Sequence, residues 1–174
     1  DAHVGEIIST LDRLKLADNT IIILISDHGW HLDEHGLWGK VTLWQEGSRV
    51  PCIIIAPHVT RPASVCTHPI ELIDCYPTLC QLCGVPIPLN IDGISLVPQL
   101  KDPQAPLPRP AFTVVERAHI WGKAVNTERY RYTEWDDGKK GIELYDLKSD
   151  PKEFKNLAKD PSQAGEIAKL KAIL

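Results

Sequence analysis

The chain has 174 residues, of which 43% are hydrophobic and 24% charged, and its formal net charge is −4. This composition is typical of a folded globular chain and excludes collagen, a coiled coil and a disordered segment. Its longest apolar runs, residues 21–25 and 52–56, fall far short of the roughly 20 residues that cross a bilayer. We therefore expect no membrane partner, and because lysine and arginine are scattered rather than clustered, we expect no nucleic-acid partner.

The first predicted elements are an amphipathic helix and a buried strand. We expect the helix to end near Leu16 and to lie on a sheet. Its apolar stripe consists of Val4, Ile7, Ile8, Leu11 and Leu14. Residues 20–26, TIIILIS, are apolar on both faces, which is typical of a strand covered on both sides in a parallel sheet. A helix followed by such a strand indicates an α/β fold.

A second strand and a second helix follow. Residues 51–57, PCIIIAP, repeat the buried-strand pattern between two prolines. Residues 70–83 have helical spacing, with Pro77 at the start of the main helix and Gly84 after its end. The predicted apolar stripe of this helix consists of Leu72, Ile73, Tyr76, Leu79, Leu82 and Cys83. For the five cysteines of the chain we predict core thiols, with a disulfide or a metal cluster as alternatives.

The C-terminal part of the sequence has a different pattern. A proline-rich stretch at residues 86–110 reads as a connection and predicts a boundary near residue 105, which divides the chain into domains at 1–105 and 106–174. Short alternating strands are then predicted at residues 112–115, 123–125, 129–135 and 142–145, with a hairpin turn at Asp137 and Gly138. We expect these strands to form an antiparallel sheet, with a closing helix at 163–174 packed on it.

The densest group of chemically active side chains lies at residues 26–49, SDHGWHLDEHGLWGKVTLWQEGSR. Ligands of α/β sheets gather beyond the carboxyl ends of strands, and Asp27 and His28 come first in that position. A carboxylate oxygen and an imidazole nitrogen before the flexible Gly29 suit a divalent metal. The alternative is that Asp27 caps a helix and His28 is an ordinary turn residue.

Lys40 follows at a distance that allows its ammonium to return to this site and bind an oxyanion such as sulfate or phosphate. The alternative is a solvated surface lysine. The three tryptophans of the stretch are predicted to be core residues or pocket walls. They are Trp30, Trp38 and Trp44.

The stretch HLDEH, residues 31–35, matches the HxxEH signature of zinc peptidases, which places two histidines on one face of a long helix. Gly29 and Gly36 leave too little room for such a helix, which argues against this reading.

The segments SDHGWHLDEHGLWGK and RVPCIIIAP together resemble the sulfatase family of the alkaline phosphatase superfamily, nearest to iduronate-2-sulfatase and its bacterial relatives. The blocks IELIDCYPTLCQLCGVPIP, DGISLVPQL, RYRYTEW and ELYDLKSDPKEFKNLA continue the likeness in family order. The resemblance implies an α/β fold, with residues 1–105 as the C-terminal part of an alkaline-phosphatase-like sulfatase core. Residues 106–174 would then form a small antiparallel sheet with a C-terminal helix.

The resemblance also implies roles for individual residues. Asp27 and His28 correspond to ligands of the family's active-site calcium ion, and Lys40 corresponds to the lysine that contacts the substrate sulfate and assists catalysis. Trp30, His31 and Glu34 are expected as neighbours in the substrate pocket.

One departure from the family pattern concerns the nucleophile. Sulfatases make formylglycine from a Cys or Ser in a CxPxR or SxPxR motif, beside two metal-binding aspartates, and no cysteine here has that context. We therefore interpret the chain as the C-terminal portion of a sulfatase, inactive alone, whose missing N-terminal part supplies the formylglycine and completes a partial calcium site.

The expected function is hydrolysis of a sulfuric ester, on a sulfated small molecule or glycan. The alternatives are a phosphatase or phosphonate hydrolase of the same superfamily, and a non-catalytic anion-binding module. Relatives are commonly exported to the periplasm, the lysosome or the medium, but the sequence itself predicts no compartment.

Overall fold

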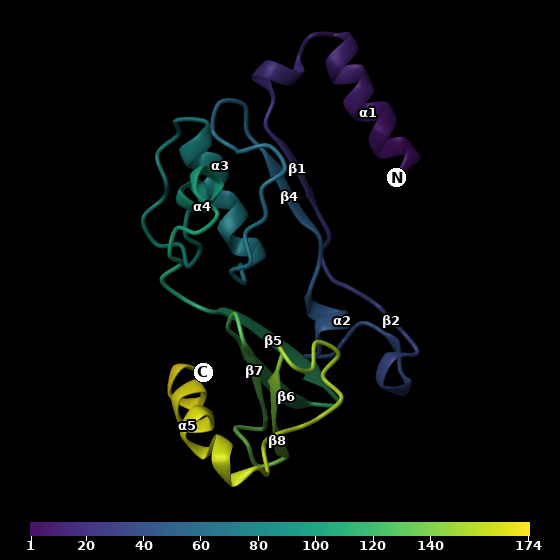
Figure 1. Cartoon of the computed structure of the whole chain (residues 1–174), viewed down its shortest axis with the longest axis vertical. Helices are drawn as coiled ribbons and strands as arrows, with labels where there is room; N and C mark the ends of the chain where they lie inside the picture. The colour runs from purple at the N-terminus through teal and green to yellow at the C-terminus, as the bar shows by residue number, and fades with distance from the viewer. The chain divides into compact units, whose positions relative to one another are not determined.

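The computed structural model describes all of residues 1–174 and contains five α-helices, four short 3-10 turns and eight strands (Figure 1). The helices are α1 (Ala2–Arg13), α2 (Gln45–Ser48), α3 (Cys75–Leu82), α4 (Val97–Lys101) and α5 (Ala164–Ile173). The strands are β1 (Ile22–Ile25), β2 (His31–Leu32), β3 (Trp38–Gly39), β4 (Cys52–Ile55), β5 (Ala111–Arg117), β6 (Ile120–Asn126), β7 (Tyr130–Trp135) and β8 (Gly141–Asp146). None of the helices is long and apolar enough to span a bilayer.

The chain packs as two compact units. The first unit comprises residues 1–26, 51–66 and 73–106, and the second comprises residues 27–50, 67–72 and 107–174. The chain passes for the last time from one unit to the other after residue 106, but two earlier segments also belong with the C-terminal sheet. The division into domains at 1–105 and 106–174 stays a prediction.

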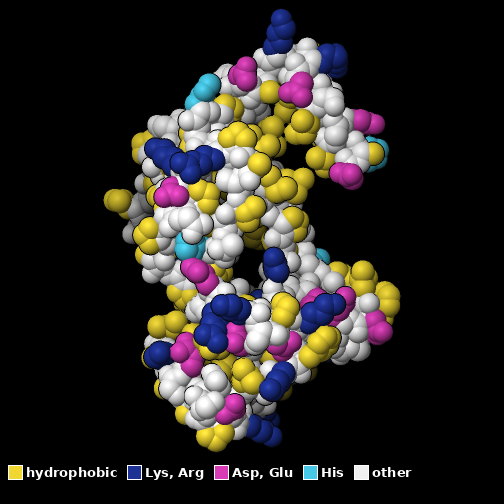
Figure 2. Space-filling view, in the orientation of Figure 1, with side chains coloured by type: hydrophobic (Ala, Val, Ile, Leu, Met, Phe, Trp, Pro, Cys, Tyr) yellow, Lys and Arg dark blue, Asp and Glu magenta, His cyan; other side chains and the backbone are white.

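In the first unit, β1 pairs with β4 as an antiparallel two-stranded ladder. The expectation of parallel strands covered on both faces is therefore wrong for this pair. Ile25, Ile53 and Ile55 are each more than 40% exposed, and Figure 2 shows hydrophobic side chains at the surface of this unit. An apolar pattern on both faces reports what the strand can bury, whereas direction and cover depend on the elements that pack beside it.

The helices of the first unit also bury less than their patterns predict. α1 has no buried residue, and Ile7 is 63% exposed, so the expectation that it lies on a sheet is wrong for this structure. α3 begins at Cys75, which leaves Pro77 in its first turn, where a missing N–H costs nothing. The predicted stripe of Tyr76 and Leu79 is exposed.

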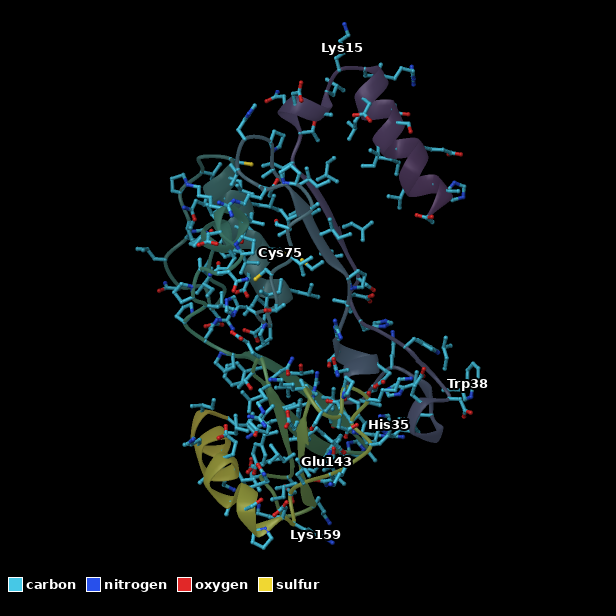
Figure 3. The ribbon with its side chains drawn as sticks, in the orientation of Figure 1. Lys15, His35, Trp38, Cys75, Glu143 and Lys159 are labelled. Atoms are coloured by element: carbon cyan, nitrogen blue, oxygen red, sulfur yellow. The ribbon has the colours of Figure 1, made fainter.

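The opposite face of α3 is the buried one. Thr78 donates a hydrogen bond to the Asp74 carbonyl and accepts one from the Leu96 N–H. Cys75, labelled in Figure 3, and Cys80 are buried free thiols, as predicted. Cys83 is exposed, and all five cysteines are unpaired by disulfides.

The second unit is built on the predicted antiparallel sheet, in the order β5-β6-β7-β8. The turn after β7 carries Asp137 and Gly138, as expected, with Gly138 at φ +87°. One face of the sheet packs against α5, as predicted. Its core consists of Val125, Tyr132, Leu144 and Leu170. The residues between these positions on β7 and β8 point to the other face, because side chains alternate along a strand.

Candidate functional site

The segment that follows β1 begins with a turn whose shape depends on Gly29. Its N–H donates to the Gly47 carbonyl at 3.0 Å. A Cβ at position 29 would lie 2.0 Å from the Glu46 carbonyl oxygen, so no other residue fits against α2. The turn that carries Asp27 and His28 is thereby attached to the end of this short helix.

A small hairpin then returns the chain to the same place. β2 and β3 pair with His31 opposite Gly39. Lys40, the residue after β3, therefore returns to the residues that precede β2. Its ammonium lies 2.7 Å from the Nε2 atom of His28.

The three residues predicted to form the ionic site thus lie together. The Oδ2 atom of Asp27 is 3.3 Å from the Nε2 atom of His28, which also faces Lys40. The Nδ1 atom of His28 is 2.8 Å from the Gly29 carbonyl oxygen, which can only accept. This contact assigns the proton to Nδ1 and leaves a lone pair on Nε2. The Asp27 carboxylate and the Lys40 ammonium therefore both lie beside the Nε2 atom of His28.

The group formed by Asp27, His28 and Lys40 is open to solvent. The Asp27 side chain is 83% exposed and that of His28 is 33% exposed, so a cation or an anion can reach them. The chain brings no group of three or more His, Cys, Asp or Glu side chains together as a complete metal site. It brings together one carboxylate, one imidazole and one ammonium.

The remaining predicted pocket residues build the hairpin. His31 is fully buried, with Nε2 at 2.7 Å from the Thr42 hydroxyl and Nδ1 at 3.2 Å from the Glu34 carbonyl. The Glu34 carboxylate accepts the Leu32 N–H at 2.6 Å, and this bond lowers the pKa of Glu34. Trp30 is 53% exposed, with its ring centroid 6.3 Å from that of His28. Contact of these residues with a substrate stays a prediction.

The HxxEH reading is wrong, because the segment forms no long helix. His31 lies on β2, while His35 has a φ of 56° in a single 3-10 turn, Glu34–Gly36. Tryptophan burial is also overestimated: Trp38, labelled in Figure 3, is 72% exposed at the hairpin. Trp44 is the least exposed of the three, and it stacks on His35 with ring centroids 4.2 Å apart.

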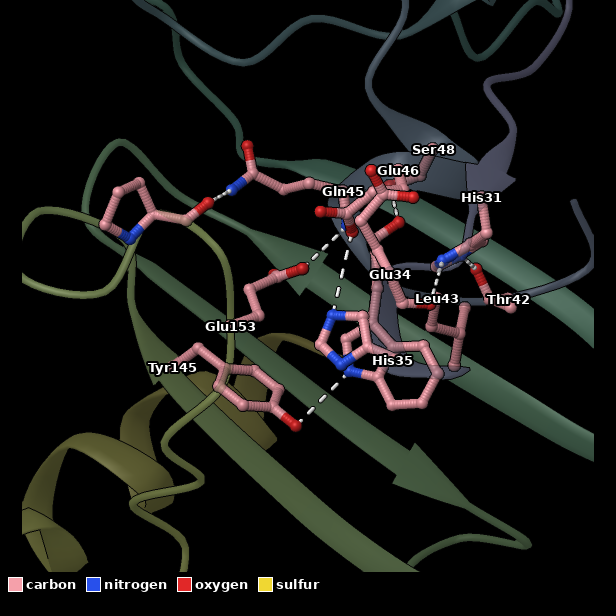
Figure 4. Close-up of polar contacts among 12 residues, drawn as sticks. His31, Glu34, His35, Thr42, Leu43, Gln45, Glu46, Ser48, Tyr145 and Glu153 are labelled. Atoms are coloured by element: carbon pink, nitrogen blue, oxygen red, sulfur yellow. Dashed lines mark hydrogen bonds and ion pairs between the residues drawn. The ribbon is translucent and has the colours of Figure 1, made fainter. Parts of the chain in front are cut away.

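Sequence reasoning missed a buried ion pair beneath the site. Arg131 on β7 and Glu153 in the loop after β8 have Nε and Oε1 2.6 Å apart, and both side chains are almost fully buried. Arg131 also donates to the Leu43 carbonyl and the Ser48 hydroxyl. Glu153 accepts the Gln45 N–H (Figure 4). The only sign of this pair in the sequence was Arg131, a charged residue within a strand of alternating pattern.

Comparison with known proteins shows what this arrangement belongs to. The family described as "N-sulphoglucosamine sulphohydrolase, C-terminal" matches residues 33–174. The chain is 33% identical over 180 residues to the Delta 4,5-hexuronate-2-O-sulfatase of Bacteroides thetaiotaomicron, covering 99% of this chain and 37% of that enzyme. It spans about a third of the length of the curated relatives it matches.

Solved structures agree with the sequence comparison. A protein in complex with its substrate D-glucosamine-2-N,6-O-disulfate superposes with a TM-score of 0.86 at 27% identity, over 98% of this chain and 36% of that one. A 2-O GAG sulfatase gives 0.83 at 32% identity, over 97% and 38%. The phosphonate monoester hydrolase of Agrobacterium radiobacter gives 0.72 at 25% identity, over 97% and 36%.

The helices and sheet therefore have the alkaline-phosphatase-like fold of these proteins, with the C-terminal sheet and helix in place. The chain belongs to the sulfatase family and corresponds to the C-terminal portion of its members.

Proposed function

We propose that the protein containing this chain is a sulfuric ester hydrolase that acts on a sulfated carbohydrate. The observation that carries the proposal is the meeting of Asp27 and Lys40 at His28, whose Nε2 atom lies 3.3 Å from Asp27 Oδ2 and 2.7 Å from Lys40 Nζ. Sulfate esters carry negative charge on their free oxygens, and a cation seated on the turn together with a lysine ammonium would bind them. Support for the carbohydrate comes from the relatives, whose names specify hexuronate and glucosamine substrates.

Asp27 and His28 would hold a calcium ion. A carboxylate oxygen is a preferred calcium ligand, and the Nε2 atom of His28 lies 3.3 Å from the Asp27 carboxylate. Calcium takes six to eight ligands, so two residues make only a part of the site, and we infer that the other ligands come from outside these 174 residues. When bound, the ion would polarise the oxygens of the sulfate group.

Lys40 would bind the anion directly with its positively charged ammonium group. Its ammonium donates to His28 in the structure, and a bound sulfate would take over one or more of its three N–H donors. His28 would then be left with its Nε2 lone pair for the cation. The short hairpin between them fixes the separation of ammonium and imidazole before the substrate arrives, and such preorganisation is the main source of electrostatic catalysis.

The nucleophile would come from outside this chain. All five cysteines lack the proline two places on and the arginine four places on that formylglycine formation requires in this family. We therefore expect no turnover by the isolated chain. Mixing it with the part of the protein that carries the formylglycine should restore activity, and rapid turnover by the chain alone would contradict this interpretation.

The function is tested on the full-length protein with a panel of sulfated disaccharides, by measuring released inorganic sulfate. Lys40→Ala and Asp27→Asn should each lower kcat/KM by at least about 100-fold, the usual scale for removing a preorganised charge. Lys140→Ala, which removes an exposed lysine elsewhere in the second unit, is the matched control and should have no effect. Equal activity in all three variants would refute the assignment.

A second function to test is hydrolysis of a phosphonate or phosphate ester, since a structural neighbour is a phosphonate monoester hydrolase. The same assay with phosphonate and phosphate monoesters separates the two chemistries by their kcat/KM values. A non-catalytic anion-binding module would bind sulfated sugars in calorimetry without releasing any sulfate.

A further inference from the structure

The short helix α2 joins the two halves of the candidate site. The turn bearing Asp27 and His28 is attached to its carbonyls through Gly29, with an N–H to carbonyl distance of 3.0 Å to Gly47. Lys40 leads directly into it, through a tight turn in which the Thr42 N–H donates to the Lys40 carbonyl at 2.8 Å. A displacement of α2 would therefore shift both halves of the site.

The position of α2 is fixed in turn by the ion pair on the sheet. Arg131 Nη1 is 2.5 Å from the Leu43 carbonyl oxygen, just before α2, and 2.8 Å from the Ser48 hydroxyl at its end. The second oxygen of Glu153 accepts the first N–H of the helix, that of Gln45, at 2.7 Å. Figure 4 shows the Glu153 side chain directed toward Gln45. Two side chains thus hold both ends of α2.

This pair is an inefficient way to gain stability. Burial raises the pKa of Glu153 to about 7 and lowers that of Arg131, although each faces an opposite charge. Desolvation therefore outweighs the mutual attraction, and apolar residues of similar volume would stabilise such a position at least as well. What apolar residues would not provide is the set of directional hydrogen bonds to Leu43, Gln45 and Ser48.

We propose that Arg131 and Glu153 are positioning residues that set, through α2, the placement of Lys40 relative to the Asp27–His28 turn. The inference rests on the proposed function, because it takes those three residues as the anion site. A misplacement of about 1 Å far from the chemistry can cost about 100-fold in rate. The C-terminal sheet would then determine catalytic geometry without contacting the substrate.

The test uses the full-length protein and the double variant Arg131→Met with Glu153→Leu, which keeps the volume and removes the hydrogen bonds. We expect the melting temperature to stay close to that of the wild type, because buried ion pairs replaced by apolar residues are often neutral or stabilising. We expect kcat for a chromogenic aryl sulfate or a sulfated disaccharide to fall at least tenfold. Amide hydrogen exchange should accelerate at residues 27–30 and 40–48.

The matched control lies on the same strand but on the opposite face. Glu134 on β7 is buried and paired at 2.9 Å with Lys171 of α5, and the double variant Glu134→Gln with Lys171→Met should leave kcat and KM unchanged. Glu153→Gln keeps an oxygen for the Gln45 N–H and should retain more activity than the double variant. A folded double variant with wild-type kcat, KM and hydrogen exchange would overturn the proposal.

Two further outcomes are informative. If the wild type releases no sulfate, the proposed function fails, and calorimetry with inorganic sulfate decides the present inference. Binding at least tenfold weaker in the double variant supports it, whereas equal binding, or none in the wild type, overturns it.

If the double variant does not fold, Arg131→Lys takes its place, since it keeps the charge but loses the fork of donors. The same fall in kcat is then expected, and unchanged kinetics would overturn the proposal.

Discussion

The two faces of the C-terminal sheet have opposite characters, although the same strands build both. On the face toward α5, the buried side chains are mostly apolar. They include Val125, Tyr132, Leu144 and Leu170. On the face toward α2, the alternate positions carry Arg131, Thr133, Glu143 and Tyr145. Alternation along β7 and β8 thus separates a hydrophobic core from a polar network by a single residue step.

The polar face is organised by hydrogen bonds that reach the loop after Lys40. The Tyr145 hydroxyl accepts from the Trp44 indole N–H at 3.3 Å and donates to Glu143 at 3.2 Å. Burial raises the pKa of Tyr145 to about 12 and also raises that of Glu143. The apolar face stabilises the unit by burial, while the polar face specifies where a loop lies. The comparison teaches that one strand can stabilise the unit with one face and position a loop with the other.

The largest expected effect is on the polar face, where Arg131→Met leaves the Glu153 carboxylate buried without its partner. Breaking a buried pair from one side costs about 3–5 kcal/mol of unfolding free energy. Chemical denaturation of the full-length protein at neutral pH measures this loss. The double variant with Glu153→Leu should regain most of the lost unfolding free energy. An Arg131→Met variant as stable as the wild type would show that water reaches the pair.

A somewhat smaller loss is expected on the apolar face. Leu170 is 2% exposed in the centre of the cluster, so Leu170→Ala should lower the unfolding free energy by about 2–5 kcal/mol. The matched control is Ile173→Ala on the same helix, where the side chain is 48% exposed and the effect should stay within about 0.5 kcal/mol. Equal losses at the two positions would contradict the assigned orientation of α5.

The faces should also differ in pH dependence. The pKa of Glu153 is raised to about 7 in the folded state by burial, so the folded protein holds this proton more tightly than the unfolded chain. Stability therefore falls as the pH rises from the ordinary glutamate range to about 7, by an amount on the order of 2 kcal/mol.

The check on this pH dependence is the difference between the wild type and Glu153→Gln, measured by denaturation from pH 4.5 to 7.5. The variant has no carboxyl group at this position, so the decline contributed by Glu153 should disappear from its curve. A difference that is constant across this range would show that Glu153 ionises normally.

The smallest effect is expected at the rim of the apolar face. Lys171 and Tyr132 both bond to Glu134, and these bonds lower its pKa despite the opposing effect of burial. The stability they provide is present at neutral pH and is lost as the pH falls through the folded-state pKa. Because Lys171 is 57% exposed, Lys171→Met should cost less than about 1 kcal/mol. High salt should shrink the difference, and a larger loss would indicate a more buried pair.

Local pattern was sufficient for much of this fold. The alternation in RYRYTEW and ELYDL predicts β7 and β8, and the closing helix predicted at residues 163–174 corresponds to α5. The structure confirms both, with α5 packed on the sheet. Periodicity works there because one face of each element meets one core. It also predicted α1 and β1 as elements, but not their surroundings, because an apolar pattern does not specify which element covers it.

For the candidate site, the sequence singled out Asp27, His28 and Lys40 by residue type, by their place after a strand and by family likeness. The β2–β3 hairpin explains in three dimensions why residues 12 positions apart come within 2.7 Å. The roles assigned to these residues stay proposals, and the kinetics of the variants above will test them.

By itself, then, the sequence determined the alternating strands, the closing helix and the family to which the chain belongs. Only the tertiary structure decided the direction of β4, the burial of His31 and the support of α2 by Arg131 and Glu153. The Arg131 contact with Leu43 spans 88 positions and that of Glu153 with Gln45 spans 108. Hydrogen bonds across such separations depend on where two distant segments meet, and they leave no periodic trace in either one.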